Sequence, residues 1–151
     1  MTKLSKGQKA PEFSTVNQRN EVISSKEWYD KKVVLYFYPK DDTPGCTAEA
    51  CSLRDNFDLL KSKGYTIYGI SPDGVKKHVK FIEKFDLPFD LLADEDHSVA
   101  MLFGTWIEKS MYGRKYMGMA RITFIIENGI ISDLIEKVDT KNHAQQVLEI
   151  F

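Results

Sequence analysis

The feature of this sequence that most limits its fold is the apolar run Val33-Val34-Leu35-Tyr36-Phe37-Tyr38. The run is β-branched and aromatic and does not alternate with polar residues, which is typical of a strand buried on both faces of a sheet. Pro39 ends it, because proline cannot continue a central strand. We therefore expect a central, fully buried strand at residues 33–38.

Helix-like segments alternate with this strand and with a second one. The first helical stretch begins near Cys46 and stops at Gly64. Its apolar residues recur at spacings of three and four and so share one face: Ala50, Leu53, Phe57 and Leu60. A second strand covers Tyr65 to Ile70, and Ser71-Pro72-Asp73 then predicts the opening of another helix. This order predicts a parallel sheet covered by helices.

The last third of the chain predicts a hairpin and a closing helix. Asn128-Gly129 separates two strand-like runs, Ile122–Ile126 and Ile130–Val138, and Asn-Gly is the strongest short hairpin signal. Residues 140–151 predict a helix with four inward residues: Ala144, Val147, Leu148 and Phe151. The whole order is that of an α/β, thioredoxin-like fold with a central mixed sheet flanked by helices. No repeat or linker interrupts it, so we expect a single domain over residues 1–151.

The charges and apolar runs argue against several classes of partner. Lys and Arg number 21 against 22 Asp and Glu, a net charge of −1, so no basic excess exists to bind nucleic acid or an acidic membrane surface. The longest apolar run, residues 122–126, is far too short to cross a bilayer. Residues 1–7 lack the apolar core of a secretion signal. We therefore expect a cytoplasmic protein without nucleic-acid or membrane partners.

Cys46 and Cys51 are the only cysteines, and their setting indicates chemistry. A lasting structural disulfide is disfavoured in a reducing compartment, and so local a bridge would stabilise little. Cys46 follows the turn Thr43-Pro44-Gly45 in the first turn of a helix, where free N–H groups and the helix dipole favour the thiolate. The alternative is an inert core cysteine, because Cys46 also lies on the apolar stripe, four residues before Ala50.

The spacing of the two cysteines predicts two conformations. In an ideal helix, residues five apart lie roughly 8.5 Å apart at Cα and some 140° around the axis. A disulfide needs Cα atoms closer than about 7 Å, so an intact helix cannot hold one between Cys46 and Cys51. We expect an intact helix in the reduced protein and an unwound first part of the helix when the two cysteines are bonded.

One segment closely resembles the active-site region of the PrxQ class of peroxiredoxins, the bacterioferritin comigratory proteins. It runs Tyr36-Phe37-Tyr38-Pro39-Lys40-Asp41-Asp42-Thr43-Pro44-Gly45-Cys46-Thr47-Ala48-Glu49-Ala50-Cys51. Pro39, Thr43 and Cys46 match the peroxiredoxin pattern Pro-x-x-x-Thr-x-x-Cys. The resemblance continues in order over most of the chain, through Leu53-Arg54-Asp55, Gly69-Ile70-Ser71, Leu92-Ala93-Asp94-Glu95-Asp96-His97, Phe103-Gly104 and Arg121-Ile122-Thr123-Phe124-Ile125-Ile126.

The resemblance implies a thiol-dependent peroxidase for hydrogen peroxide and organic hydroperoxides. Cys46 would be the peroxidatic cysteine, oxidised to a sulfenic acid, and Cys51 the resolving cysteine that forms a disulfide with it. Thr43 would offer its hydroxyl to the peroxide and the thiolate, and Arg121 would be the active-site arginine. Thioredoxin or a similar dithiol would restore both thiols, no cofactor or metal would be needed, and the chain would be a monomer or weak homodimer.

Without the resemblance, blander interpretations of these residues stay open. Arg121 alone is typical of a solvated strand residue, and Thr43 of an ordinary turn. Two rival functions also remain. One is a general thiol–disulfide oxidoreductase, which would carry Cys-x-x-Cys rather than the Cys-x₄-Cys found here. The other is a non-enzymatic redox-sensing or holdase-like module that uses the disulfide as a switch.

The remaining polar residues give weaker signals. Three histidines, His78, His97 and His143, are each expected to be surface or cap residues rather than metal ligands, and Cys-x₄-Cys lacks the second pair of a zinc site. Asp94-Glu95-Asp96 should cap a short helix that carries Val99 and Leu102. A further aromatic and basic stretch either borders the active site or forms a solvated loop: Trp106, Lys109, Tyr112 and Tyr116.

Overall fold

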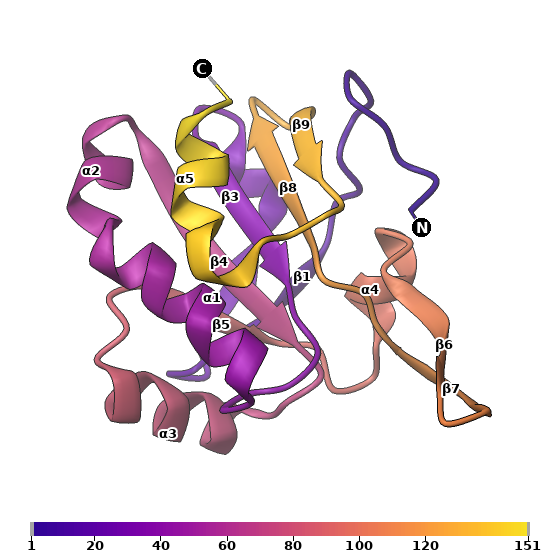
Figure 1. The fold of residues 1–151 in the computed structure, drawn as a ribbon. Coiled ribbons are helices and arrows are strands. Elements are labelled where there is room, and N and C mark those ends of the chain that lie inside the picture. The colour runs from indigo at the N-terminus through magenta and orange to yellow at the C-terminus, as the bar shows by residue number, and fades with distance from the viewer. Residues whose placement is uncertain (1, 151) are drawn as a thin grey trace.

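The computed structural model describes residues 2–150, which form a large mixed sheet, a small two-stranded sheet and helices around them (Figure 1). The strands are β1 (Ser14–Asn17), β2 (Val22–Ser24), β3 (Lys32–Phe37), β4 (Tyr65–Ser71), β5 (Asp90–Ala93), β6 (Trp106–Met111), β7 (Arg114–Met119), β8 (Ile122–Glu127) and β9 (Ile130–Ile135). The helices are α1 (Pro44–Asp55), α2 (Phe57–Ser62), α3 (Val75–Phe85), α4 (Ser98–Leu102) and α5 (His143–Leu148), with 3₁₀ turns η1 (Ser25–Trp28) and η2 (Thr140–Asn142).

The large sheet has the strand order β2-β1-β5-β4-β3-β8-β9. β3 and β4 are parallel, as are β4 and β5, whereas β8 is antiparallel to β3. The expected parallel unit and central mixed sheet are therefore confirmed. The carboxyl ends of β3 and β4 reach the same edge of the sheet, and the chain continues from them towards α1 and α3.

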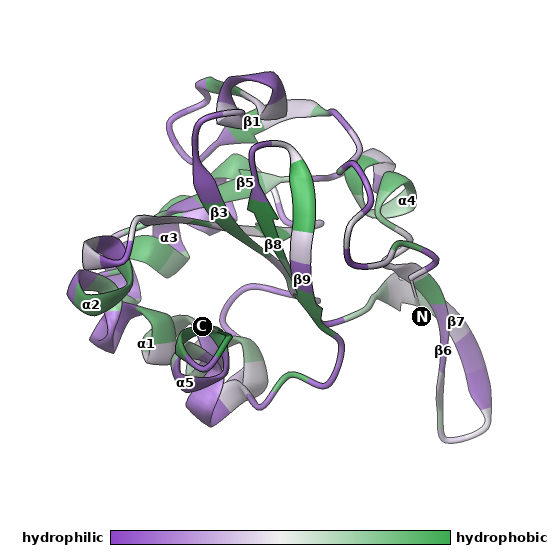
Figure 2. Cartoon of the chain, turned by 90° about the horizontal axis from the view of Figure 1, so that it is seen from above, coloured by the Kyte–Doolittle hydropathy of each residue, from purple (hydrophilic) through white to green (hydrophobic). Residues whose placement is uncertain are grey.

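The continuous apolar sequence of β3 is explained by cores on both faces of the sheet. One core takes Val33, Leu35 and Phe37, and the other takes Val34, Tyr36 and Tyr38. The first core includes residues of α4, and the second includes residues of α1, α2, α3 and α5. Figure 2 shows these four helices on one side of the sheet and α4 on the other.

The prediction of one helix from near Cys46 to Gly64 is wrong, because the helical segment breaks at Asn56 between α1 and α2. The side-chain Nδ2 of Asn56 donates to Ser52 O over 2.9 Å. Asparagine side chains compete in this way with the backbone bonds of a helix. The expected apolar face is still present, since Ala50, Leu53 and Leu60 are completely buried.

The hairpin prediction is confirmed by β8 and β9. Asn128 and Gly129 join them with φ angles of 51° and 76°, the left-handed conformation that Asn-Gly provides readily. β9 ends at Ile135 rather than Val138, and the closing helix is reduced to η2 and α5. Ala144 and Val147 are buried as expected, while Phe151 lies outside the described residues.

The sequence did not predict β1, β2, β5 or the β6–β7 hairpin. β1, β2 and β5 have only three or four residues each, too few to show a clear period. The stretch from Trp106 to Tyr116, for which a solvated loop was one expectation, instead forms β6 and β7. This hairpin projects from the body of the protein (Figure 1), and Tyr112 at its tip is 98% exposed. Between residues 2 and 150, no helix is both long enough and apolar enough to span a membrane.

Candidate active site

Cys46 lies at the start of α1, after the carboxyl end of β3. Thr43 precedes the helix in an extended conformation and Pro44 takes the first helical position, where a missing N–H costs nothing. The Cys46 side chain is 1% exposed and belongs to the core beneath α1, and its thiol is free. The thiol therefore combines the helix-start position with the apolar-stripe position that the sequence predicted.

Arg121 reaches Cys46 from the segment that leads into β8. Its Nη2 donates to Cys46 Sγ over 3.3 Å, and its Nη1 donates to Glu49 Oε1 over 2.8 Å. Burial alone would lower the pKa of Arg121, but Cys46 and Glu49 raise it overall. The structure thus holds a planar cation between a carboxyl group and the sulfur, where it can stabilise negative charge on either.

Gly45 allows this close approach of the arginine. A Cβ atom added at Gly45 would lie 3.2 Å from Arg121 Nη2, closer than side-chain contacts normally allow. The helix start therefore lacks a side chain at the point where the guanidinium lies, which explains a glycine between Pro44 and Cys46.

Thr43 is placed directly before the helix, but its side chain does not cap it. Thr43 Oγ1 donates to Lys40 O over 2.9 Å. With its proton engaged in this way, the hydroxyl oxygen keeps lone pairs that can accept a hydrogen bond from a ligand.

Glu49 is a residue of this site that the sequence analysis missed. It follows Cys46 by three residues on α1, a spacing that places two side chains on one helix face. Its side chain is completely buried, and this burial raises the pKa of Glu49 to about 7 against the opposing effect of Arg121. The signal that could have found it is a carboxylate one turn after a cysteine on an apolar stripe.

The expectation that all three histidines lie at the surface or at helix caps is wrong for His78, which is fully buried. His143 is the C-cap residue of η2 but is fully buried as well. His143 Nε2 lies 2.8 Å from Thr123 Oγ1 and 3.4 Å from Glu49 Oε2. Burial lowers the pKa of His143. His97 is the N-cap residue of α4 as expected and stacks on Trp106. The polar partners that allow burial of a histidine lie far away in sequence, so its own neighbours do not reveal it.

His78 belongs to a buried network that holds the loop before α1. Its Nδ1 lies 2.7 Å from Asp41 Oδ2 and its Nε2 lies 2.9 Å from Leu92 O. Asp41 also accepts a hydrogen bond from Tyr38 Oη over 2.5 Å, and its own N–H donates to Asp73 Oδ2 over 2.7 Å. His78 lies on α3 and Leu92 on β5, so the network ties the loop that carries Thr43 to these two elements.

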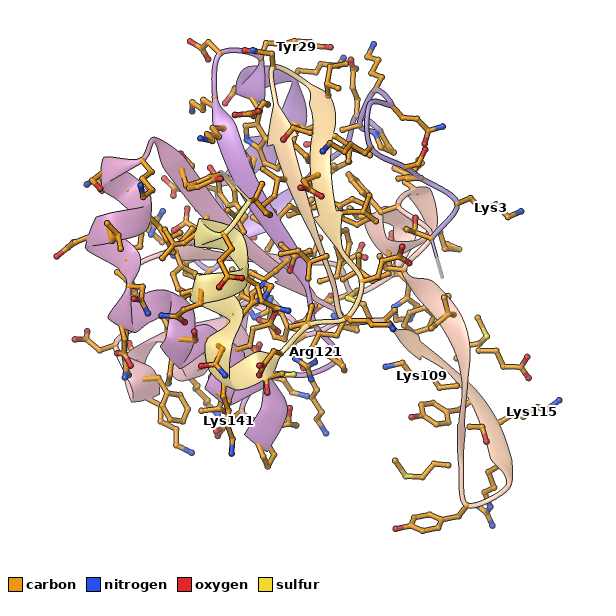
Figure 3. All side chains as sticks on the ribbon, turned by 45° about the horizontal axis from the view of Figure 1, so that its top comes forward. Lys3, Tyr29, Lys109, Lys115, Arg121 and Lys141 are labelled. Atoms are coloured by element: carbon orange, nitrogen blue, oxygen red, sulfur yellow. The ribbon has the colours of Figure 1, made fainter. Side chains whose placement is uncertain are left out.

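Lys109 of β6 borders the same region. Its Nζ donates to Met119 O over 2.5 Å, and burial, followed by the charge of Arg121, lowers the pKa of Lys109 while Cys46 opposes the change. Figure 3 shows Lys109 and Arg121 near the root of the hairpin, with Lys115 further out. The stretch from Trp106 to Tyr116 was expected either to border the active site or to form a solvated loop. For Lys109, these contacts support the first interpretation.

Cys51 lies on α1 with its side chain partly exposed, and its thiol is free. Residues 46–51 are helical throughout, the conformation expected of the reduced protein. Asp94 caps α4 by accepting from Val99 N and Ala100 N, which confirms the expected cap. Within the described part of the chain, no group of three or more His, Cys, Asp or Glu side chains is arranged to hold a metal ion.

Comparison with known proteins identifies the family. Residues 6–134 match the AhpC/TSA family. Peroxiredoxin Bcp of Escherichia coli is 45% identical over 149 residues, covering 98% of this chain and 96% of the relative. Peroxiredoxin Bcp of Bacillus subtilis is 42% identical over 144 residues, covering 95% and 92% of the two chains.

A solved structure of peroxiredoxin Q from Xanthomonas campestris superposes with a TM-score of 0.86 at 32% identity, over 91% of this chain and 88% of the other. The expected thioredoxin-like fold and the resemblance to the PrxQ class are thereby confirmed. The chain belongs to the AhpC/TSA family and, within it, to the Bcp peroxiredoxins, which are thiol-dependent peroxidases.

Proposed function

We propose that the protein reduces hydrogen peroxide and organic hydroperoxides by a cycle in which Cys46 is oxidised and Cys51 forms a disulfide with it. The observation that carries this proposal is the 3.3 Å contact between Arg121 Nη2 and Cys46 Sγ at the start of α1. The sulfur lies in the first turn of α1 and accepts from the guanidinium, and both the helix start and the cation can stabilise negative charge on it.

In the first step, the Cys46 thiolate attacks the terminal oxygen of the hydroperoxide. A sulfur–oxygen bond forms while the oxygen–oxygen bond breaks, and the electron pair leaves with the second oxygen, which takes up a proton as water or an alcohol. Arg121 can stabilise the charge on the departing oxygen. The Thr43 hydroxyl, which already donates to Lys40 O, can accept a hydrogen bond from the peroxide O–H.

In the second step, Cys51 condenses with the sulfenic acid of Cys46. A sulfur–sulfur bond forms and the sulfenic oxygen leaves as water. Both cysteines lie on the continuous helix α1, and a helix does not bring residues five apart within disulfide distance. The first turns of α1 must therefore unwind before the bond can form.

In the third step, a dithiol reductant such as thioredoxin exchanges with the disulfide. The two thiols of Cys46 and Cys51 are regenerated and the reductant becomes a disulfide, so electrons balance over the cycle. The partly exposed Cys51 is the sulfur that an outside thiol can reach more easily. This recycling suits a monomer or weak homodimer in the reducing cytoplasm, which is where we place the protein.

Stopped-flow mixing with peroxide tests the roles of the two cysteines. Reduced wild type should consume peroxide over many turnovers with thioredoxin and its reducing system, whereas Cys46→Ser should consume none above background. Cys51→Ser should complete one turnover at the normal rate and then stall unless an outside thiol resolves the sulfenic acid. Peroxide consumption by Cys46→Ser at the wild-type rate would contradict the proposal.

A further inference from the structure

Behind Glu49 lies a buried titratable group, His143, that the chemistry above does not use. Its Nε2 lies 2.8 Å from Thr123 Oγ1 and 3.4 Å from Glu49 Oε2. Glu49 Oε1 is bonded to Arg121, and Arg121 is bonded to Cys46. A continuous polar chain therefore links the sulfur of Cys46 with an imidazole on α5.

The proton on the other ring nitrogen of His143 can be assigned from its neighbours. Gln146 Oε1 accepts from Asp139 N, and Gln146 Nε2 donates to Lys137 O, so the orientation of this amide is fixed. His143 Nδ1 lies 2.8 Å from the same Oε1 and must therefore carry a proton and donate it. In the neutral imidazole, Nε2 then presents a lone pair towards Glu49.

Glu49 Oε2 is the complementary end of this contact. It is buried and has no hydrogen-bond partner among residues 2–150, which is costly for an ionised carboxylate. Burial raises the pKa of Glu49 to about 7 and lowers the pKa of His143. Both shifts favour a proton on Glu49 Oε2 that points at a neutral His143. Because a neutral His143 protonated on Nδ1 has no hydrogen on Nε2, the Thr123 hydroxyl at 2.8 Å must also donate, so Thr123 and Glu49 Oε2 share the one Nε2 lone pair as their acceptor.

Building on the proposed roles of Cys46 and Arg121, we propose that His143 is a positioning residue that acts through Glu49. Glu49 Oε2 carries a proton shared with His143 Nε2, and the neutral pair leaves the charge of Arg121 available to Cys46. If the pair loses this proton, a negative charge appears beside Arg121, and the guanidinium is divided between Glu49 and the thiolate. The reactivity of Cys46 then falls.

Other charged and titratable groups around Glu49 and His143 influence how readily this pair releases its proton. Glu49 faces Arg121 from the segment before β8, Tyr36 from β3 and Cys46 on its own helix. His143 faces Arg121 and, from the segment before η2, Asp139. The Arg121 cation favours release of the proton by both members of the pair, so its retention depends on their contact with each other.

Two substitutions distinguish the effect of the shared proton from the effect of side-chain packing. Glu49→Gln imitates the protonated carboxyl group, because its amide oxygen can accept from Arg121 and its amide nitrogen can donate to His143 Nε2. His143→Gln keeps a side chain that can hydrogen-bond to Thr123 but cannot take up a proton. The side-chain amide that this substitution introduces can donate to Glu49 and so favours the ionised form of Glu49.

The test is a double-mutant cycle in a Cys51→Ser background, where Cys46 is the only thiol. The rate of the single peroxide turnover and the ultraviolet absorbance of the thiolate are followed across the neutral pH range. His143→Gln should lower both rate and thiolate fraction about fivefold near neutral pH, and less than about twofold once Glu49→Gln is added. Glu49→Gln alone should lose one ionisation from the pH profile.

Opposite results would overturn the proposal. An equal loss from His143→Gln with and without Glu49→Gln would mean that His143 only packs α5. A Glu49→Gln variant whose pH profile keeps every ionisation of the parent, or whose peroxide turnover is slowed more than about tenfold, would show that no protonated Glu49 assists Cys46. His97→Asn is the matched control, because His97 stacks on Trp106 outside this chain of contacts and should change neither rate nor profile.

Infrared difference spectroscopy supplies a readout that needs neither peroxide nor a histidine variant. The wild type should show the carbonyl band of a buried carboxylic acid near neutral pH, and Glu49→Gln should lack it. Absence of this band from the wild type would overturn the assignment. A further outcome is that the carbonyl band is present and the thiolate absorbance changes among the His143→Gln and Glu49→Gln variants as predicted, while Cys46 does not react with peroxide. In that case the proposed function fails, but the coupling between His143 and Cys46 stands.

Discussion

Arg121 Nη2 donates a hydrogen bond to Cys46 Sγ over 3.3 Å, although 75 positions separate the two residues in the chain. The sheet makes this contact possible. β3 and β8 are antiparallel neighbours, and Phe37 at the end of β3 pairs with Ile122 at the start of β8. The segment that enters β8 therefore lies beside the segment that leaves β3 for α1.

Replacing Arg121 by methionine should slow the reaction of Cys46 with peroxide by about a hundredfold, because a charged donor to the sulfur and to the leaving oxygen is lost. The substitution keeps a long apolar stem and so retains much of the packing. The rate of a single turnover in the stopped-flow instrument checks this. A rate within a few fold of the wild type would exclude a direct role for the guanidinium.

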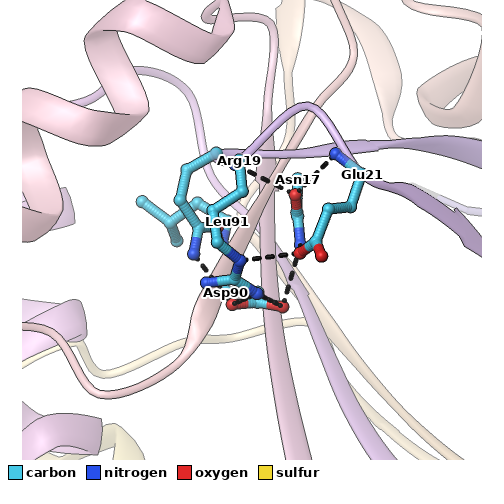
Figure 4. A network of polar contacts seen from close by, with 6 residues as sticks. Asn17, Arg19, Glu21, Asp90 and Leu91 are labelled. Carbon is cyan, nitrogen blue, oxygen red and sulfur yellow. Dashed lines mark hydrogen bonds and ion pairs between the residues drawn. The ribbon is translucent and has the colours of Figure 1, made fainter.

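Arg19 offers a matched control for the Arg121 experiment. It lies between β1 and β2, where it bonds to Glu21 and Asp90 beside Asn17 (Figure 4). Its ion pairs, like those of Arg121, involve carboxylates, but its side chain is 57% exposed. Arg19→Met should leave the peroxide rate unchanged, since exposed ion pairs contribute little even to stability.

Oxidation should unwind the beginning of α1. The helix spans 12 residues and carries both cysteines, and its geometry keeps residues five apart too far for a disulfide. Treating the reduced protein with one equivalent of peroxide should therefore increase hydrogen exchange of the amides of residues 46–51. The Cys51→Ser variant, which cannot close the disulfide, should keep its protection under the same treatment. Full protection in the disulfide form would refute the two-conformation prediction.

The His78–Asp41 pair should be important for stability. His78→Leu would leave the buried Asp41 carboxylate without its imidazole partner, which typically costs about 3–5 kcal/mol. Urea unfolding measures this loss. Adding Asp41→Asn removes the stranded charge and should recover most of the loss, because the neutral amide can still accept from Tyr38. A loss below about 1 kcal/mol for His78→Leu would mean that water enters and solvates Asp41.

The parts of this site that the sequence could predict are local. The continuous apolar run predicts β3, and the turn residues before Cys46 predict the start of α1, because both depend on neighbouring residues. Asn128-Gly129 specifies its hairpin for the same reason. The position of Arg121 beside Cys46 depends on the pairing of β3 with β8, and only the resemblance to peroxiredoxins pointed to it.

Glu49 and His143 show where local reasoning stops. A glutamate in a helix and a histidine near a chain end are ordinarily solvent-exposed. Their burial depends on each other and on Arg121, and these three residues come from α1, α5 and the segment before β8. The spacing of Glu49 one turn after Cys46 could have marked this residue, but no pattern within one segment shows that the three residues meet. β1 and β5 escaped prediction for a related reason, since each is short and is held in the sheet by pairing with neighbouring strands, β1 with β2 and β5, and β5 with β1 and β4.

Glu49 should make the stability of the protein fall as the pH rises through the weakly acidic range. Its ordinary pKa is 4.5, and burial raises the pKa of Glu49 to about 7 in the folded protein. Between these values the folded state holds a proton that the unfolded chain has released, so the free energy of unfolding decreases with increasing pH. The decrease should begin near pH 4.5 and be complete above about pH 7, with a size of about 3 kcal/mol.

The comparison of wild type with Glu49→Gln isolates this effect. Burial lowers the pKa of His143, so below its ordinary pKa the folded state binds fewer protons than the unfolded chain, and this contribution to stability rises with pH. Because His143 is present in both proteins, its contribution largely cancels in their difference. The stability of Glu49→Gln relative to the wild type, from urea unfolding at a series of pH values, should therefore increase by about 3 kcal/mol between pH 4.5 and about pH 7. A difference that stays constant over this range would mean that Glu49 is ionised in the folded protein throughout.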